Sequence, residues 1–299
     1  MESRQKKQQN EKGNCMIRKI KRVVRGEAGV DGAGVHLTHV LSRHTMHDTD
    51  PLLLLDAFDA TDPADYVAGF PMHPHRGIET ISYVVEGTMV HRDSLGNEDA
   101  VEGGGIQWMT AGSGILHEEK LPPVERLFGV QLWLNMKKED KFAPPAYVAV
   151  PSQSIPEIPF DGGHVRILAG SYKGHEGHLS RYVPVDYYDV HIEPGCAFQT
   201  EVSEKVNATL FALVGSPTVE GERVDHFDAA ILEGGDEIRI ANDTDEEISV
   251  LLFMAEPMDE PIAWWPGPIV MNTEEELKEA YDEIKAGTFI KDKIAMSRE

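Results

Sequence analysis

The chain has 299 residues, of which 41% are hydrophobic, and its formal net charge at pH 7 is −23. No apolar run approaches the roughly 20 residues of a membrane-spanning helix, so no membrane span is expected. The excess of acidic residues argues against direct nucleic-acid binding, because such binding depends on neutralising phosphates. Only two cysteines are present, Cys15 and Cys196, so no disulfide framework is expected. We expect both to be free thiols in a reducing cytoplasm.

The N-terminal segment differs in charge from the rest of the chain. Residues 1–26 carry nine Lys or Arg against two Glu, so this segment is about +7 and the remainder about −30. The first fifteen residues are polar and poor in apolar side chains. We therefore expect residues 1–16 to form a disordered basic tail, or an extension upstream of a start at Met16, and not a nucleic-acid-binding arm.

A run of strand and turn signals follows between residues 69 and 120. Residues 69–87 lead from a turn into an apolar, β-branched stretch that ends on Glu-Gly. Short strands are predicted near 90–93 and 99–101, on either side of a hairpin connection, and near 106–110. The Gly-containing turn at 111–114 then leads into a strand that begins at Ile115. This region is predicted to be a small β-barrel.

Two pairs of potential metal ligands lie in this region at a spacing of i and i+2. The pairs are His73 with His75 and His117 with Glu119. Alternate side chains of a strand point to one face, so each pair can converge on one ion, whereas Glu118 faces the other way. A single histidine is usually a surface or hydrogen-bonded residue, but two such pairs in matching turns favour a metal site. Imidazole suits iron, copper, nickel or zinc.

The segment that follows predicts a domain boundary and a second barrel. Five prolines between residues 144 and 159 favour extended, irregular backbone and place the boundary near residue 150. Strand signals then recur within 187–195, 208–215, 236–242 and 247–254. The counterpart of the first ligand motif, near 198–208, contains no histidine, and His191-Ile-Glu193 is the nearest match. We expect no metal in this barrel, which would be structural or present a partner surface.

The last predicted element is a helix after Asn272 or Thr273, either of which can cap it. Three glutamates occupy its first turn, and Lys285 and Gly287 end it. Leu277, Ala280, Tyr281 and Ile284 share one face, and that face is expected to pack against a barrel.

The order of Gly, His-x-His, Glu and Gly, followed by Gly, Thr-x-Gly and His, resembles the two cupin motifs. More narrowly, the chain resembles the pirin family over roughly residues 17–289 in these segments: Phe70-Pro71, 73–77, Glu79-Thr80, 107–112, 114–117 and 267–273. This resemblance implies an all-β fold of two tandem cupin (jelly-roll) barrels with a short C-terminal helix. Residues 17–150 would form the metal-binding cupin domain, and residues 151–299 a cupin domain without metal that ends in the helix.

The resemblance also implies the cofactor and the ligands. Pirins bind iron in the N-terminal barrel, and position by position the ligands fall on His73, His75, His117 and Glu119. In ordinary cupins the carboxylate would come from the first motif, here Glu79, which we interpret as a supporting or structural carboxylate. Fe(II) is the implied ion, and other divalent transition metals also suit this set.

Two functions from different classes follow from the resemblance. The first is a quercetin 2,3-dioxygenase-type oxidoreductase that uses O2 and a flavonol-like substrate, with Glu119 in a second, catalytic role as a base. The second is a regulatory protein without enzymatic activity, in which the state of the metal alters a surface that binds a protein partner. Under either hypothesis we expect a cytoplasmic monomer.

Overall fold

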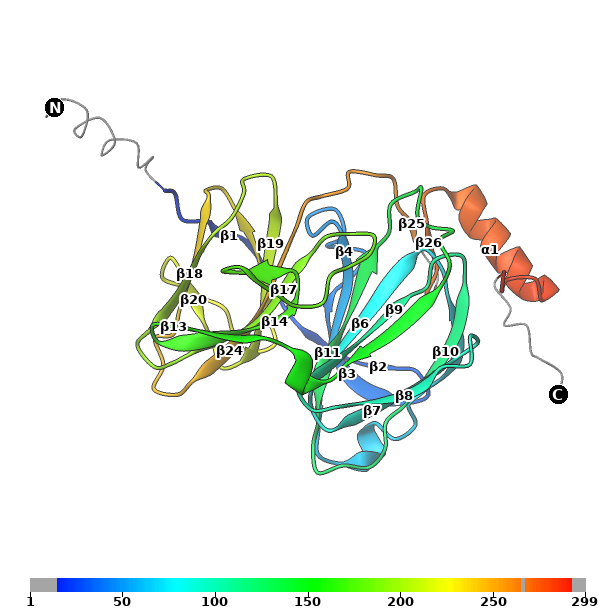
Figure 1. The fold of residues 1–299 in the computed structure, drawn as a ribbon, viewed down its shortest axis with the longest axis horizontal. Coiled ribbons are helices and arrows are strands. Elements are labelled where there is room, and N and C mark those ends of the chain that lie inside the picture. The colour runs from blue at the N-terminus through cyan, green and yellow to red at the C-terminus, as the bar shows by residue number, and fades with distance from the viewer. Residues whose placement is uncertain (1–14, 265–266, 292–299) are drawn as a thin grey trace, which may run out of the picture.

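The computed structural model describes residues 15–264 and 267–291, which fold into two β-barrels side by side and one helix at the outer end of the first barrel (Figure 1). The predicted fold class, all-β with two cupin barrels and a short C-terminal helix, is confirmed. Each barrel is built from a seven-stranded sheet that faces a four-stranded sheet.

The first barrel carries the candidate site. Its large sheet has the strand order β12 (Ala146–Val150), β9 (Gly105–Thr110), β6 (Ile78–Glu86), β11 (Leu127–Asn135), β4 (Leu52–Ala60), β3 (Val35–Leu41) and β2 (Glu27–Asp31). Its small sheet has the order β5 (Phe70–His75), β10 (Ile115–Lys120), β7 (Thr88–Asp93) and β8 (Glu98–Glu102). The strands and the hairpin expected between residues 69 and 120 are therefore confirmed.

The second barrel repeats this plan. Its large sheet has the order β1 (Lys19–Val24), β22 (Ala229–Glu233), β19 (Asn207–Val214), β24 (Ile248–Ala255), β17 (Asp186–Ile192), β14 (Gly163–Ala169) and β13 (Glu157–Phe160). Its small sheet has the order β18 (Ala197–Glu201), β23 (Glu237–Ala241), β20 (Thr218–Val219) and β21 (Glu222–Arg223). The remaining short elements are η1 (Pro63–Asp65), η2 (Ser152–Ser154), β15 (Ser171–Tyr172), β16 (His175–Glu176), β25 (Ala263–Trp264) and β26 (Val270–Met271).

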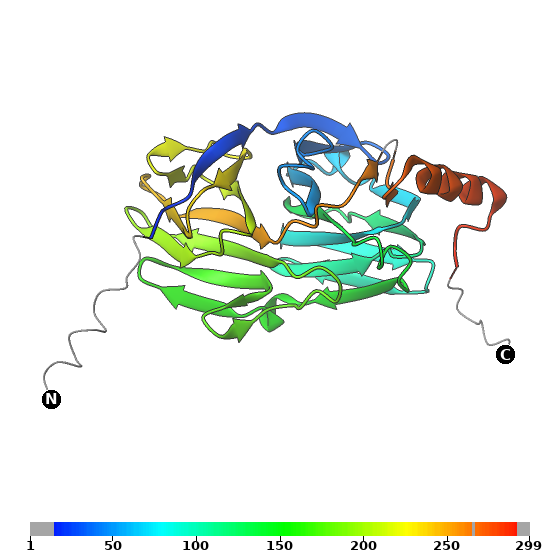
Figure 2. The ribbon, with the colours of Figure 1, turned by 90° about the horizontal axis from the view of Figure 1, so that it is seen from above.

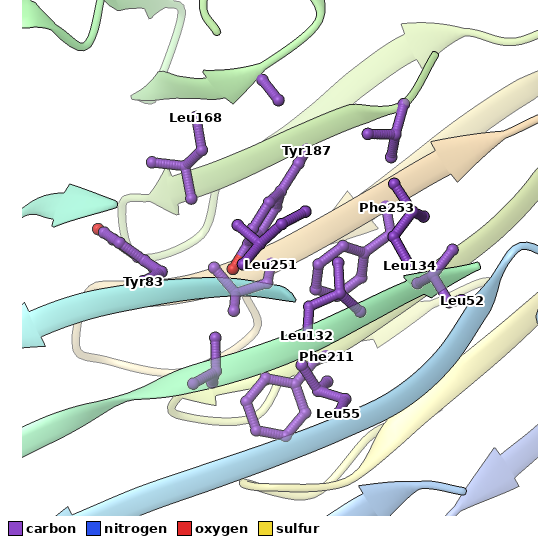
Figure 3. Close-up of a cluster of buried hydrophobic side chains, with 14 of the residues drawn as sticks. Leu52, Leu55, Tyr83, Leu132, Leu134, Leu168, Tyr187, Phe211, Leu251 and Phe253 are labelled. Carbon is purple, nitrogen blue, oxygen red and sulfur yellow. The ribbon is translucent and has the colours of Figure 1, made fainter. Parts of the chain in front are cut away.

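The two large sheets share one hydrophobic core between the barrels. Alternate residues of β6 and β11, such as Ile81 and Leu132, belong to the same buried cluster as Tyr187, Phe211 and Phe253 of the second barrel (Figure 3). Because side chains alternate along a strand, the intervening residues of β6 and β11 point into the first barrel instead. The strand period thus separates an apolar interface from the interior that holds the site.

Each end of the chain contacts the barrel formed mainly by the other half. β1 pairs with β22 of the second barrel, and the chain then crosses to the first barrel, where β2 pairs with β3 (Figure 2). Near the C-terminal end, Ile269 forms a β-bridge with Arg76 of the first barrel, and the backbone N–H of Val270 donates to the carbonyl of Arg76. The boundary near residue 150 stays a prediction, and this crossing adds a second connection between the halves.

The predicted tail, residues 1–16, lies outside the described residues apart from Cys15 and Met16. The backbone N–H of Met16 donates to Asp236 at 2.8 Å. Both cysteines are free. In the described ranges the structure contains no helix whose length and apolar character would let it cross a membrane.

The C-terminal helix α1 (Glu274–Ala286) begins and ends as predicted. Thr273 is the N-cap and forms a capping box with Glu276, and Gly287 ends the helix in the left-handed conformation at φ 69°. Leu277 and Ala280 are buried, and Tyr281 and Ile284 pack against the same cluster. The helix is thereby fixed to the first barrel beside β25 and β26.

Candidate metal centre

Three imidazoles converge inside the first barrel. β5 and β10 are antiparallel neighbours, and His73 lies directly opposite His117 in their register. His75 is two residues from His73 on the same strand, so the rings of all three approach within 4.4 to 4.9 Å between centroids. One ligand atom from each lies within 4.8 Å of the others.

Backbone carbonyls determine which ring nitrogens face the centre. His73 Nδ1 lies 2.8 Å from the carbonyl of Pro71, and His75 Nδ1 lies 3.1 Å from the carbonyl of Pro268. A carbonyl can only accept, so each Nδ1 carries the hydrogen and each neutral ring has its lone pair on Nε2. The two Nε2 atoms are 3.0 Å apart. Two facing lone pairs at that distance suit a cation between them, because bonds of about 2.1 Å to one ion separate neighbouring ligands by about 3 Å.

A second histidine and an aspartate orient His117. His91 Nε2 lies 2.9 Å from Asp93 Oδ2, and His91 Nδ1 lies 3.4 Å from His117 Nδ1. Asp93 accepts the Nε2 hydrogen of His91, so His91 Nδ1 is an acceptor and His117 Nδ1 is the donor to it. This leaves the lone pair of His117 on Nε2, which is buried and has no hydrogen-bond partner in the described part of the chain.

Burial favours the neutral form of His75 and of His117. It lowers the pKa of His75 well below its ordinary value, with His73 adding to the effect. It lowers the pKa of His117 in the same way, and there the neighbouring His75, His73 and His91 add to it. Neutral imidazole is the form that binds metal. The buried Nε2 of His117, which has no partner in the described ranges, and the two facing Nε2 atoms of His73 and His75 together fit a divalent transition ion.

Glu119 lies on β10 on the same face as His117, as strand parity predicts, but it is not one of the three residues whose ligand atoms cluster. It is only 2% exposed. Its Oε1 accepts hydrogen bonds from Gln107 at 2.8 Å and Gln131 at 3.0 Å, and its Oε2 accepts one from Gln131 at 3.0 Å. The carboxylate is thus held by amide donors inside the barrel, next to the histidines.

The other two carboxylates considered in this region point elsewhere. Glu79 is fully buried on the face of β6 toward the second barrel, where it accepts hydrogen bonds from Thr110 at 2.7 Å and Ser180 at 3.2 Å. Burial raises the pKa of Glu79. Glu118 turns away from the interior and forms an ion pair with Arg92 at 2.7 Å. Glu79 is therefore a structural carboxylate at the interface, as interpreted from the sequence.

A cavity of about 710 Å³ opens onto the centre. His73, Gln131 and Trp133 line it, and Trp133 also packs edge-on against His75 with ring centroids 5.1 Å apart. Further apolar walls come from Phe58, Phe70, Trp264 and Pro268. His73 therefore connects the buried histidine group with a space large enough for a small aromatic molecule.

The interior of the second barrel is apolar. Phe198, Ile238 and Ile240 fill it together with Val190 and Val250. Among the described residues, His73, His75 and His117 are the only set of three or more potential ligands whose ligand atoms cluster. The expectation of no metal in this barrel remains a prediction, which these packed side chains support.

Several residues around the centre were not identified from the sequence. They are His91 and Asp93, which orient His117, and Gln107 and Gln131, which hold Glu119. The sequence contains a feature that could have identified each pair. His91 and Asp93 repeat the spacing of two residues, and a glutamine within an apolar strand is an unusual residue to bury.

Comparisons with known proteins agree with this architecture. The family model described as Pirin matches residues 34–134, and the model of the Pirin C-terminal cupin domain matches residues 187–290. A pirin-like protein of Caulobacter vibrioides is 39% identical over 91% of this chain and 99% of its own length. A Pseudomonas aeruginosa protein, named as a candidate quercetin 2,3-dioxygenase, is 37% identical over 88% of this chain and 94% of its own. The crystal structure of an Acinetobacter baumannii quercetin 2,3-dioxygenase superposes with a TM-score of 0.84 at 32% identity, covering 92% of this chain and 99% of that one.

Proposed function

The chain belongs to the pirin family, and on this basis we propose that it is an iron-dependent dioxygenase of flavonol-like substrates. The proposed ligands are His73, His75, His117 and Glu119. The observation that carries the proposal is the pair of Nε2 atoms 3.0 Å apart beside the buried Nε2 of His117, which has no hydrogen-bond partner among the described residues. Other divalent transition metals suit the same donors.

When bound, Fe(II) would supply a Lewis acid for the substrate hydroxyls and a redox centre for reaction with O2. The side chains of this protein have separate tasks. The walls formed by Phe58, Phe70 and Trp133 would hold an aromatic substrate and exclude water from it.

Glu119 is proposed to act also as a base. Among the described residues, its Oε2 receives one amide donor, whereas its Oε1 receives two amide donors and the hydroxyl of Ser82, so Oε2 is the oxygen better placed to accept a substrate hydroxyl proton. The hydrogen bonds from Gln107 and Gln131 would keep the carboxylate oriented while it does so.

The first experiment compares two adjacent carboxylates on β10. We expect Glu119→Gln to lower iron affinity at least about tenfold and to abolish turnover, because a neutral amide is a poor ligand and a poor base. Glu118→Gln is the matched control and should retain both properties. Iron content is measured by elemental analysis, and turnover by the consumption of O2 and quercetin in a one-to-one ratio. A Glu119→Gln protein with full iron and full turnover would contradict both roles of Glu119.

One observation favours a second function, a regulatory protein that acts through a protein partner. Arg76, next to His75, is 1% exposed and connects the centre to helix α1 through Glu283 at 2.7 Å and to the segment after the helix through the carbonyl of Phe289 at 2.9 Å. A change at the metal could thus reach a surface helix. Iron-loaded protein that binds no flavonol and consumes no O2 would support this alternative. In both cases we propose a cytoplasmic monomer.

A further inference from the structure

A second pair of titratable groups lines the cavity, and the proposed function does not use it. His39 on β3 and Asp56 on β4 lie directly opposite each other in register, with His39 Nδ1 2.8 Å from Asp56 Oδ1. Both line the cavity that His73 also lines. Asp56 is only 7% exposed, and in the part of the chain that the structure describes, His39 is the only hydrogen-bond partner of its carboxylate.

The ring of His39 is held on two sides. Asp56 accepts the hydrogen of Nδ1, which leaves Nε2 as the free acceptor. On the other side the ring lies against Gly29 of β2, where an added Cβ would be 2.5 Å from both Nε2 and Cδ2. The hydrogen bond to Asp56 raises the pKa of His39, with Asp31 and Glu27 adding to the effect, and burial raises the pKa of Asp56. A histidine oriented by a buried carboxylate is a suitable proton acceptor.

The register of the large sheet places this dyad relative to the metal centre. Gln107, Ser82, Gln131, Asp56 and His39 lie opposite one another in turn on β9, β6, β11, β4 and β3. They form one polar row across five strands. Gln107 at one end of the row and Gln131 in its middle donate hydrogen bonds to Glu119, and His39 is at the other end. Since neighbouring strands are about 4.8 Å apart, His39 lies about 10 Å from Gln131.

The backbone distance of about 10 Å between His39 and Gln131, which holds the proposed ligand Glu119, is close to the length of a molecule of two or three fused or linked aromatic rings. The walls between the two ends are apolar and aromatic, among them Leu54, Phe58 and Trp133. A ligand that spans the cavity would therefore need polar groups at its two ends and a flat apolar body between them.

From this arrangement we propose that the His39–Asp56 dyad is a second anchor for the substrate and accepts the proton of an acidic aromatic hydroxyl at the end remote from the metal. In this step the O–H bond breaks, the proton forms an N–H bond at His39 Nε2, and the electron pair stays on the phenolate oxygen. The carboxylate of Asp56 balances the charge of the imidazolium. The inference rests on the proposed function for the metal end, and it narrows the substrate to flat aromatic molecules with acidic hydroxyls at both ends.

The test compares two flavonols that differ only in the hydroxyls of the remote ring, quercetin and the analogue that lacks them. Binding to the iron-loaded protein is followed by the quenching of tryptophan fluorescence, because Trp133 and Trp264 line the cavity. We expect the wild type to prefer quercetin about tenfold, since a site built for a hydroxyl discriminates against its absence. His39→Gln and Asp56→Asn should remove the preference and leave the iron content unchanged.

Two further variants make the result specific. Gly29→Ala keeps both members of the dyad but displaces the ring, and it should also remove the preference. His36→Gln is the matched control, because His36 on the same strand pairs with Asp65 at 3.3 Å, is exposed and does not line the cavity. It should keep the wild-type preference.

The outcomes separate this inference from the proposed function. A wild type that prefers quercetin through His39 but consumes no O2 contradicts the dioxygenase and leaves the anchor standing. A wild type that binds both flavonols alike, or binds neither, overturns the anchor. A His39→Gln variant that keeps the preference for quercetin also overturns the anchor, whatever its rate of turnover.

Discussion

At the scale of single residues, the main property of the candidate centre is the direction of three nitrogen lone pairs. Pro71 and Pro268 fix the tautomers of His73 and His75 through their carbonyls, and Asp93 fixes that of His117 through His91. Each ring is therefore oriented before any ion binds. Such preorganisation reduces the ordering that binding requires.

The role of His91 gives a prediction at this scale. His91→Phe keeps a ring to stack on Tyr147, whose centroid is 4.0 Å away, but removes the acceptor for His117 Nδ1. We expect iron affinity to fall about 10- to 100-fold, with the circular dichroism spectrum unchanged. Metal titration against a competing chelator measures the affinity.

Tyr147→Phe serves as the control for that variant. It removes a hydroxyl that has no hydrogen-bond partner among the described residues and leaves the stack in place. Its affinity should equal that of the wild type. Equal affinities in His91→Phe and Tyr147→Phe would show that His91 does not orient His117.

At the scale of elements, helix α1 supports the strand that carries the centre. Arg76 follows His75, and its buried guanidinium contacts the helix at Glu283 and packs over the ring of Phe289 at 4.2 Å. The carbonyl of Ser113, in the turn before β10, accepts a further hydrogen bond from Arg76 Nε at 2.7 Å. One side chain thus connects β5, the turn before β10 and the helix.

The capping box provides the prediction for this element. Thr273→Ala removes the side-chain acceptor for the backbone N–H of Glu276, and we expect the free energy of unfolding to fall by about 1 kcal/mol. Denaturant titration measures this change. Glu279→Ala, at an exposed position within the same helix, should change the free energy by less than about 0.5 kcal/mol. A loss in Glu279→Ala as large as that in Thr273→Ala would refute the assignment to the cap.

At the scale of the whole molecule, a buried polar network accompanies the apolar interface between the barrels. Asp189 of β17 accepts hydrogen bonds from Tyr83 of the first barrel at 2.6 Å and from Ser249 at 2.6 Å. His191 Nε2 lies 3.1 Å from the same carboxylate, and its Nδ1 lies 3.1 Å from Glu247. Although burial disfavours its charged form, the hydrogen bonds to Asp189 and Glu247 raise the pKa of His191 to about 9.

This raised pKa predicts how stability depends on pH. An unfolded histidine titrates near 6.5, so between about pH 6.5 and 9 the folded state binds more protons than the unfolded one. The contribution of His191 is therefore complete below pH 6.5 and is lost as the pH rises through 9. We expect a loss of about 2 kcal/mol over this range, after allowance for solvent screening at the part-exposed ring.

His191→Gln should remove this part of the pH dependence, whereas His175→Gln, at an exposed position on β16, should retain it. Denaturant unfolding at a series of pH values provides the measurement. Parallel pH curves for the wild type and His191→Gln would contradict the assignment to His191.

The sequence by itself determined the features that depend on near neighbours in the chain. The spacing of two residues places His73 with His75, and His117 with Glu119, on common faces of their strands, and Thr273 and Gly287 mark the ends of the helix. Such patterns can be recognised in the sequence because strand and helix periods are local properties of the backbone.

Only the tertiary structure decided which strands that are distant in the sequence lie next to one another. The polar row from Gln107 to His39 joins five strands of which only β3 and β4 are consecutive in the sequence, and β1 pairs with a strand more than 200 residues away. Register between distant strands is set by the packing of whole sheets and by the faces they bury, so no local pattern encodes it. For the same reason the sequence showed the histidines of the centre but neither the residues that orient them nor the cavity that leads to them.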